Sequence, residues 1–339
     1  MITQPSRFQS IVVPLDGSDL AEQAIPIAEA IAQRARCKLK LVLVHQPSIV
    51  MEPGPDYAKL ELMMEKADRD YLKSVTGAIS ERLGRLVSSA VLKGSPVAQR
   101  LATHARELGA DLVVMTSHGR GGVRRAWLGS VTDQLIRSAE VPVLVVRPGE
   151  AGTARSAWEP GEILVALDGS PLAEAALEPA VEVAKLFQAE LSLVQVVRPI
   201  LPTSGPPLSF PSGYSDQVLA IRRGSAQDYI RDVAERVRES GVRASGVAVT
   251  GGTIPETLIG LAEPARVGLI AVATHGLGGL SRMVLGSVAD KVVRGANVPV
   301  LVVRPTSRRG RRKSEEVDVD EYTPSKEHSH EHYHHEGRH

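Results

Sequence analysis

The chain has 339 residues, 43% of them hydrophobic, which is enough for two average domains with separate cores. Its net charge is only +1 and 3% of its residues are aromatic, which argues against a nucleic-acid surface, since such a surface needs a basic footprint and stacking platforms. The first residues carry no apolar signal segment, no run reaches the length of a membrane span, and one cysteine, Cys37, excludes an intrachain disulfide. We therefore expect a cytoplasmic protein without a nucleic-acid or membrane partner.

In chain order, the first half alternates short apolar runs with longer segments of helical periodicity. The apolar runs 11–15, 39–45, 87–92, 112–115 and 141–146 are typical of buried strands. This alternation predicts an α/β fold with a parallel, doubly wound sheet. Pro26 must kink the helix expected over 20–35 or lie in its first turn. The long helix expected over 56–83 has a predicted buried side made of Leu60, Met63, Met64, Ala67, Tyr71 and Leu72.

The second half repeats the first. Asp168 follows Asp16 by 152 residues inside matching runs, and Ser287 follows Ser130 by 157 residues inside a second matching pair. The duplication predicts a domain over 1–148, a Gly/Pro-rich linker over 149–161 and a second domain over 162–306. Each domain should have its own five-stranded sheet.

One glycine-rich stretch in each half joins a strand to a helix. The stretches run over 113–132 and 270–289, and both contain His-Gly, Gly-Gly and Leu-Gly-Ser-Val. Glycines allow the backbone to approach a ligand closely. The helices are expected to begin at Ser130 and Ser287, where unpaired N–H groups and the helix dipole suit a phosphate.

The last segment, 307–339, differs from the rest of the chain. A basic block, an acidic block and six histidines follow one another with few aliphatic residues, so we expect a disordered tail. The histidines are consistent with a solvated, tag-like end or with loose binding of a metal.

These motifs resemble the universal stress protein family. The spacing of a small residue, two others, Gly, nine others and Gly-Ser resembles its ATP-binding signature, and it occurs at Thr116–Ser130 and at Ala273–Ser287. The resemblance covers about 8–147 and 161–304. It implies an adenine nucleotide alpha hydrolase-like, Rossmann-like fold with strand order 3-2-1-4-5 in each of two five-stranded parallel sheets.

The resemblance also implies an ATP site with Mg²⁺ in each half. In the first half the implied site residues are Pro14, Leu15, Asp16, Gln46, Met115, Thr116, His118, Gly119, Arg120, Gly129, Ser130, Val131 and Thr132. In the second half they are Ala166, Leu167, Asp168, Val196, Ala273, His275, Gly276, Gly286, Ser287, Val288 and Ala289. The chain departs from the family where Thr116 and Ala273 replace the usual glycine. The hydroxyl of Thr132 has no counterpart at Ala289, which predicts weaker binding in the second half.

Several of these residues also have a purely structural interpretation. Asp16 and Asp168 are candidate helix caps as well as ligand contacts. His118 and His275 are either bases or turn residues held by the backbone, and no nucleophile beside them is evident. Arg120, with Arg124 and Arg125, either screens a triphosphate or is ordinary surface charge.

The function implied is an ATP-binding regulator or sensor of stress with slow or no hydrolysis, and no catalytic residue is assigned. The chain lacks the motif of a P-loop ATPase, and a dinucleotide dehydrogenase would carry its glycines after the first strand. An ATP pyrophosphatase would need paired glycines that Leu15–Asp19 lacks. An adaptor of the same fold that binds no nucleotide stays an alternative.

The last strand of each half is apolar and would otherwise be an exposed edge. We therefore predict that strands 141–146 and 298–303 pair, so that one chain forms a pseudo-dimer of its halves; a homodimer of whole chains is also possible.

Overall fold

The computed structural model describes residues 6–46, 55–118, 128–148, 158–199, 214–263, 266–275 and 285–305. The predicted tail, most of the predicted linker and the central parts of both glycine-rich stretches lie outside these residues. The first half contains β1 (Ser10–Leu15), α1 (Asp19–Glu22), α2 (Ile25–Ala35), β2 (Lys38–His45), α3 (Pro55–Leu83), β3 (Ser88–Lys93), α4 (Val97–Glu107), β4 (Leu112–Thr116), α5 (Ser130–Ser138) and β5 (Val143–Val146). The second half contains β6 (Glu162–Leu167), the 3₁₀ turn η1 (Ala173–Ala176), α6 (Leu177–Phe187), β7 (Glu190–Val197), α7 (Tyr214–Glu239), β8 (Ala244–Thr250), α8 (Ile254–Ala262), β9 (Val267–Ala273), α9 (Ser287–Gly295) and β10 (Val300–Val303).

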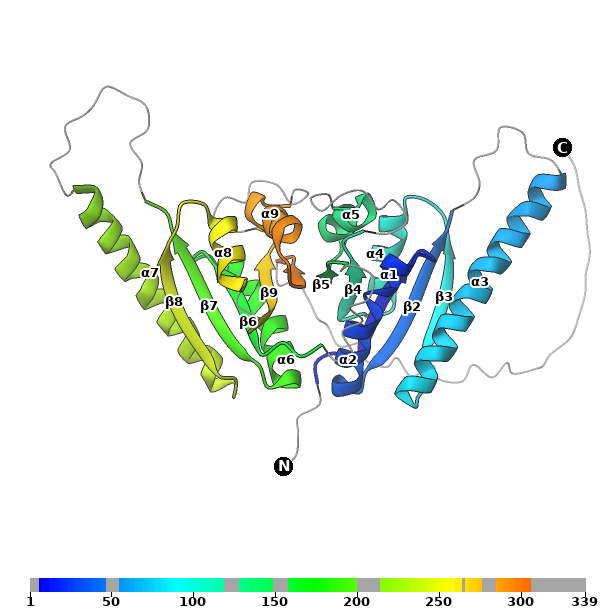
Figure 1. Ribbon diagram of the computed structural model, residues 1–339, viewed down its shortest axis with the longest axis horizontal. Coiled ribbons are helices and arrows are strands. Elements are labelled where there is room, and N and C mark those ends of the chain that lie inside the picture. The colour runs from blue at the N-terminus through cyan, green and yellow to red at the C-terminus, as the bar shows by residue number, and fades with distance from the viewer. Residues whose placement is uncertain are drawn as a thin grey trace, which may run out of the picture. The chain divides into compact units, whose positions relative to one another are not determined.

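The strands form one sheet in the order β3-β2-β1-β4-β5-β10-β9-β6-β7-β8 (Figure 1). Each half keeps the predicted order 3-2-1-4-5 with parallel neighbours. The predicted pairing of the two last strands is confirmed, because β5 and β10 run antiparallel with Leu144 opposite Leu301. The two expected five-stranded sheets are therefore joined into one, and neither last strand is left as an unpaired edge.

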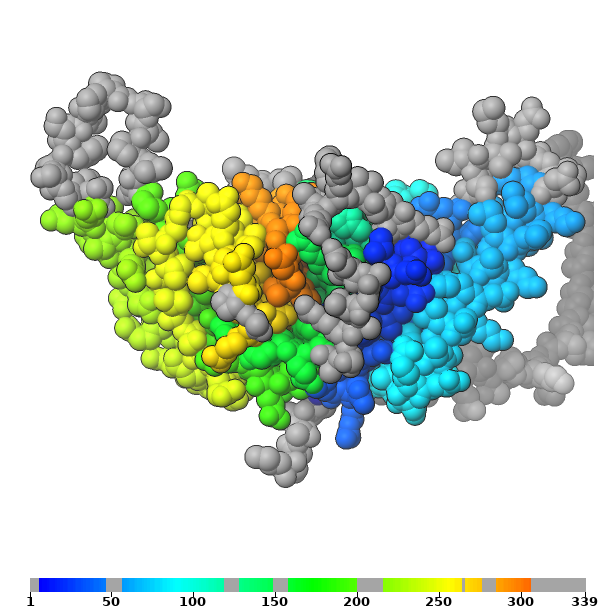
Figure 2. All heavy atoms as spheres, in the orientation of Figure 1, coloured from blue at the N-terminus to red at the C-terminus, as the bar shows by residue number. Residues whose placement is uncertain are grey.

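Helices cover both faces of the sheet. One apolar core contains buried residues of α2, α3, α6 and α7, and the other contains residues of α4, α5, α8 and α9. Each core includes residues of both halves, and α2 contacts α6 directly. Figure 2 shows α8 in yellow and α9 in orange on the viewed side of the molecule. Among the described helices, none has the combination of length and apolar composition needed to cross a bilayer.

Two arginines make reciprocal contacts across the β5–β10 junction. Arg147, just after β5, donates through Nη1 to the carbonyl oxygen of Ala296 at 3.0 Å, beyond the end of α9. Arg304, just after β10, donates to the carbonyl oxygen of Ser138 at 3.4 Å, at the end of α5. A cation at a helix carboxyl end interacts favourably with the helix dipole, so the contacts add to the strand pairing.

The single helix expected over 20–35 is divided in the structure. α1 ends at Glu22 and α2 begins at Ile25, so Pro26 lies in the first turn of α2. A proline there leaves no intrahelical bond broken, because the first N–H groups have no partner in the helix.

Cys37, just before β2, is buried, and burial raises the pKa of its thiol to about 11, which supports inert packing.

The predicted buried side of α3 is wrong for its first half. Leu60, Met63, Met64 and Ala67 are exposed, and the side chains that turn inward from this part of the helix include Glu61 and Asp68. They do so because His45, at the end of β2, binds both carboxylates. The apolar side continues as predicted only from Tyr71 and Leu72.

Candidate functional site

The ends of β1 and β6 carry the same polar turn. Asp16 Oδ1 accepts hydrogen bonds from the backbone N–H and the hydroxyl of Ser18, at 3.0 and 2.6 Å, and Asp168 binds Ser170 at the same distances. The Ser18 hydroxyl then accepts from Ala21 N at 3.2 Å and caps α1. The aspartates therefore orient the capping serine and are not themselves the caps.

The predicted helix starts are confirmed at Ser130 and Ser287, and the preceding glycines are required by a close approach of backbone. Gly129 N donates to Ser117 O and Gly286 N to Thr274 O, both at 2.8 Å. A Cβ on Gly129 would lie 3.0 Å from Ser117 O, and one on Gly286 would lie 2.6 Å from Thr274 O. Each helix thus begins against the end of the neighbouring strand, and its first residue is an exposed serine.

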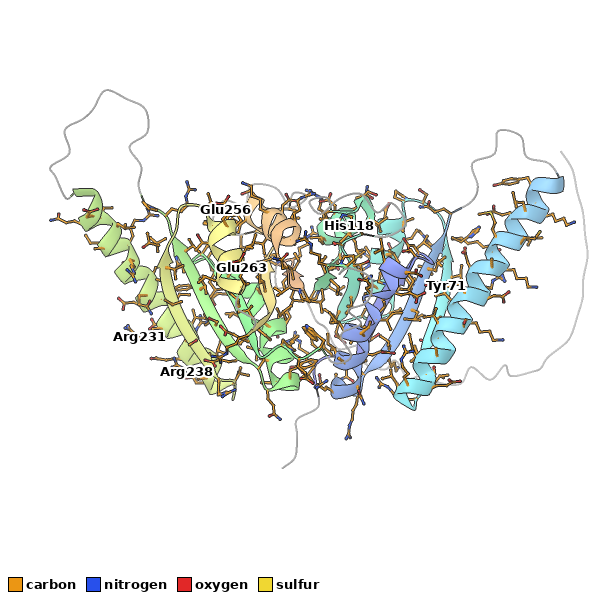
Figure 3. All side chains as sticks on the ribbon, viewed as in Figure 1. Tyr71, His118, Arg231, Arg238, Glu256 and Glu263 are labelled. Carbon is orange, nitrogen blue, oxygen red and sulfur yellow. The ribbon has the colours of Figure 1, made fainter. Side chains whose placement is uncertain are left out.

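Each of the two histidines contacts the hydroxyl of the residue before it. His118 Nδ1 lies 3.0 Å from Ser117 Oγ, and His275 Nδ1 lies 2.9 Å from Thr274 Oγ1. Burial lowers the pKa of His118, and the positive charges of Arg147 and Arg294 lower it further. The imidazole of His118, which Figure 3 labels at the end of β4, is therefore neutral at pH 7.

The hydroxyls of Thr116 and Thr132 form hydrogen bonds with backbone carbonyl groups of the protein itself. Thr116 Oγ1 donates to His118 O at 2.7 Å, and Thr132 Oγ1 donates to Thr116 O at 3.0 Å. Both side chains are buried, as are Met115 and Ala289. The missing hydroxyl at Ala289 therefore removes an internal hydrogen bond, and it is no reason to expect weaker ligand binding in the second half.

A cleft of about 1090 Å³ opens at the carboxyl ends of β6, β7 and β9 and is bounded by α7, α8 and α9. Its lining includes ten of the eleven predicted second-half residues, namely Ala166, Leu167, Asp168, Val196, Ala273, His275, Gly286, Ser287, Val288 and Ala289. The eleventh, Gly276, lies outside the described residues. A crevice at this edge, beside the start of a helix, is where doubly wound sheets bind ligands.

In the first half the corresponding residues lie along the same edge of the sheet. Pro14, Leu15 and Asp16 end β1, Gln46 follows β2, Met115, Thr116 and His118 end β4, and Gly129 to Thr132 begin α5. These ends are neighbours because β1 pairs with both β2 and β4. Gly119 and Arg120 lie outside the described residues.

The walls that α7 and α8 contribute to the cleft were not predicted from the sequence. These are Ile221, Arg222, Ser225, Ala226 and Tyr229 from α7 with Ile254 and Leu258 from α8. The Tyr229 hydroxyl donates to Glu174 at 3.0 Å, and burial with this bond raises the pKa of Tyr229. In the first half, Tyr71, labelled in Figure 3, donates to Glu22 at 2.8 Å. Aligning these two Tyr–Glu pairs in the repeat would have placed α7 on the site.

A second missed feature is a buried ionic cluster in the first half, which we name the His45 cluster. His45 is 3% exposed, its Nδ1 lies 2.6 Å from Asp68 Oδ2, and its Nε2 lies 2.7 Å from Glu61 Oε1. The bond to Asp68, followed by that to Glu61, raises the pKa of His45. Both ring nitrogens face carboxylates, so the ring is held as an imidazolium.

The second half has an apolar cluster at the same place. Val197, Ala226 and Leu219 pack together there, and they occupy the positions of His45, Asp68 and Glu61 in the repeat. The fold therefore does not require charges at this position.

Comparison with known proteins agrees with the repeat. The sequence pattern described as the universal stress protein family matches residues 7–147 and again 161–304. A universal stress protein of Mycobacterium tuberculosis is 27% identical over 308 residues, covering 89% of this chain and 99% of that protein. One of Mycolicibacterium smegmatis is 28% identical over 310 residues, covering 90% of this chain and all of that protein. The crystal structure of a universal stress protein from Archaeoglobus fulgidus aligns with a TM-score of 0.60 at 21% identity, covering 87% of this chain and 96% of that one, which supports the fold.

Proposed function

Because this chain belongs to the universal stress protein family, with one match in each half, we propose that it binds ATP and acts as a regulator or sensor of stress. The observation that carries the proposal is the pair of helix starts at Ser130 and Ser287. Each lies at the edge of the sheet, next to a glycine whose Cβ would lie 3.0 Å or less from a backbone oxygen. Such a helix start is suited to a phosphate.

The lining of the second-half cleft fits the rest of an adenine nucleotide. Apolar side chains, among them Leu167, Val196 and Val288, line it beside a few polar groups such as Asp168. Its volume of about 1090 Å³ accepts a ligand of this size. Mg²⁺ would arrive with the phosphates, because the metal offsets their negative charge and needs few carboxylate ligands from the protein. The protein would act through the bound state, with slow or no hydrolysis.

The proposal is tested by placing a negative charge at the helix starts. An aspartate in the first turn favours the helix but repels a phosphate, so binding and folding respond in opposite directions. In the double variant Ser130→Asp/Ser287→Asp we expect the affinity for MgATP to fall about tenfold or more, or ~1.4 kcal/mol, while the thermal midpoint stays equal or rises. Isothermal titration with MgATP and thermal unfolding measure the two effects, and Ser130→Ala/Ser287→Ala is the neutral control.

A nucleotide-independent adaptor is the second candidate. It is favoured by the exposed apolar side chains of α3, Leu60, Leu62, Met63 and Met64, which suit contact with another protein. Wild-type protein that takes up no MgATP on titration would favour this function over ours.

A further inference from the structure

The two halves differ in charge at the wall that α7 and the end of β7 form in the second half. The Tyr–Glu pairs align α3 with α7, since Tyr229 follows Tyr71 by 158 residues, and this alignment places Arg222 where the first half has Met64. The end of β7 aligns with the end of β2, which places Arg198 where the first half has Gln46. Two cations in the second half thus replace two uncharged side chains.

Both arginines lie at the second-half cleft. Arg198 and Arg222 belong to its lining, and Arg222 Nη1 donates to the carbonyl oxygen of Arg198 at 3.4 Å, so its guanidinium extends over the end of β7. Within the part of the chain that the structure describes, neither has a carboxylate partner. The sequence 200–213 that follows contains no Asp or Glu. Their charges are therefore available to an anionic ligand.

The first half has no cation at these two positions. Its nearby carboxylates are already paired, since Glu61 and Asp68 bind His45 and Glu65 binds Lys93 and Arg69. Arginines at a site raise the local concentration of an anion and also stack on the face of a base. The side chain at the first position of the signature spacing is also larger in the first half, where it is Thr116, than in the second half, where it is Ala273.

From these differences we infer that the two sites are not equivalent: the second-half cleft is the preferred site for an adenine nucleotide, and Arg198 and Arg222 are ligand-contacting specificity residues. This inference rests on the proposed function. The arginines of the glycine-rich stretches favour the first-half site instead, since Arg120, Arg124 and Arg125 of the first stretch outnumber Arg282 of the second. The walls and the loops thus predict opposite preferences, which makes the test decisive.

The test is isothermal titration of the full chain with MgATP at low and high salt. We expect one tight site per chain, and we expect Arg198→Gln/Arg222→Gln to weaken it about tenfold and to reduce its salt dependence. The matched control is Arg231→Gln/Arg238→Gln, which removes the same charge from α7 at residues outside the cleft lining (Figure 3). This control should bind MgATP as the wild type does.

Single helix-start variants locate the tight site. Ser287→Asp should weaken the tight site about tenfold or more, and Ser130→Asp should leave its affinity unchanged. Two equal sites, or weakening of the tight site in Ser130→Asp alone, would overturn the inference and leave the proposed function intact. A wild-type chain that binds no MgATP would overturn both.

Discussion

Replacing Leu301 by Asp is expected to lower the free energy of unfolding by about 4 kcal/mol, because it removes a large buried side chain and places a carboxyl group among apolar neighbours. Leu301 is 0% exposed and lies opposite Leu144 in the antiparallel β5–β10 pair. It also belongs to the core that both halves share. The substitution should therefore destabilise both halves together, and urea unfolding followed by far-ultraviolet circular dichroism measures the loss.

Two controls separate this effect from a general effect of the substitution. Leu62→Asp makes the same chemical change at a side chain that is 67% exposed, and it should alter the free energy of unfolding by about 0.5 kcal/mol or less. Leu301→Met keeps the volume and should cost less than about 1.5 kcal/mol. If Leu301→Asp unfolded at the same urea concentration as Leu62→Asp, the β5–β10 pair would not join the halves as described.

Replacing His45 by Val should lower the free energy of unfolding by about 2 kcal/mol, because Asp68 and Glu61 would then face each other without the cation between them. Loss of one member of a fully buried ion pair costs roughly 3–5 kcal/mol, and we reduce this figure because the carboxylates are 21% and 23% exposed. The repeat supplies the matched control, since His45→Val/Glu61→Leu/Asp68→Ala reproduces Val197, Leu219 and Ala226. This triple variant should regain the lost stability.

The same variants predict how stability depends on pH. The folded-state pKa of His45 is raised, so its contribution is complete below the unfolded value of about 6.5 and is lost as the pH rises through the folded value. As the pH rises above about 6.5 and through the raised folded-state pKa of His45, the wild type should therefore lose stability relative to the triple variant. Parallel pH dependence of the two proteins in urea unfolding would show that His45 carries no such linkage.

The elements and their order could be predicted from the sequence because they depend on local patterns. The unalternating apolar runs identified the strands, and the duplication placed Gly129–Ser130 and Gly286–Ser287 at equivalent helix starts. Even the β5–β10 pairing followed from one physical requirement, since an apolar last strand needs a partner. The site residues at the ends of β1, β4, β6 and β9 could also be predicted, since parallel strands bring their carboxyl ends to one edge of the sheet.

Only the tertiary structure decided which side chains face one another across elements. The apolar pattern of α3 favoured Leu60, Met63 and Met64 as its buried side, but His45 lies sixteen residues before Glu61 in the chain and turns that carboxylate inward instead. The same limit hid Arg222 and Tyr229, because the sequence of α7 does not tell which of its faces crosses the end of β7. Periodicity reports how apolar a helix face is, whereas its orientation depends on the partner that it meets.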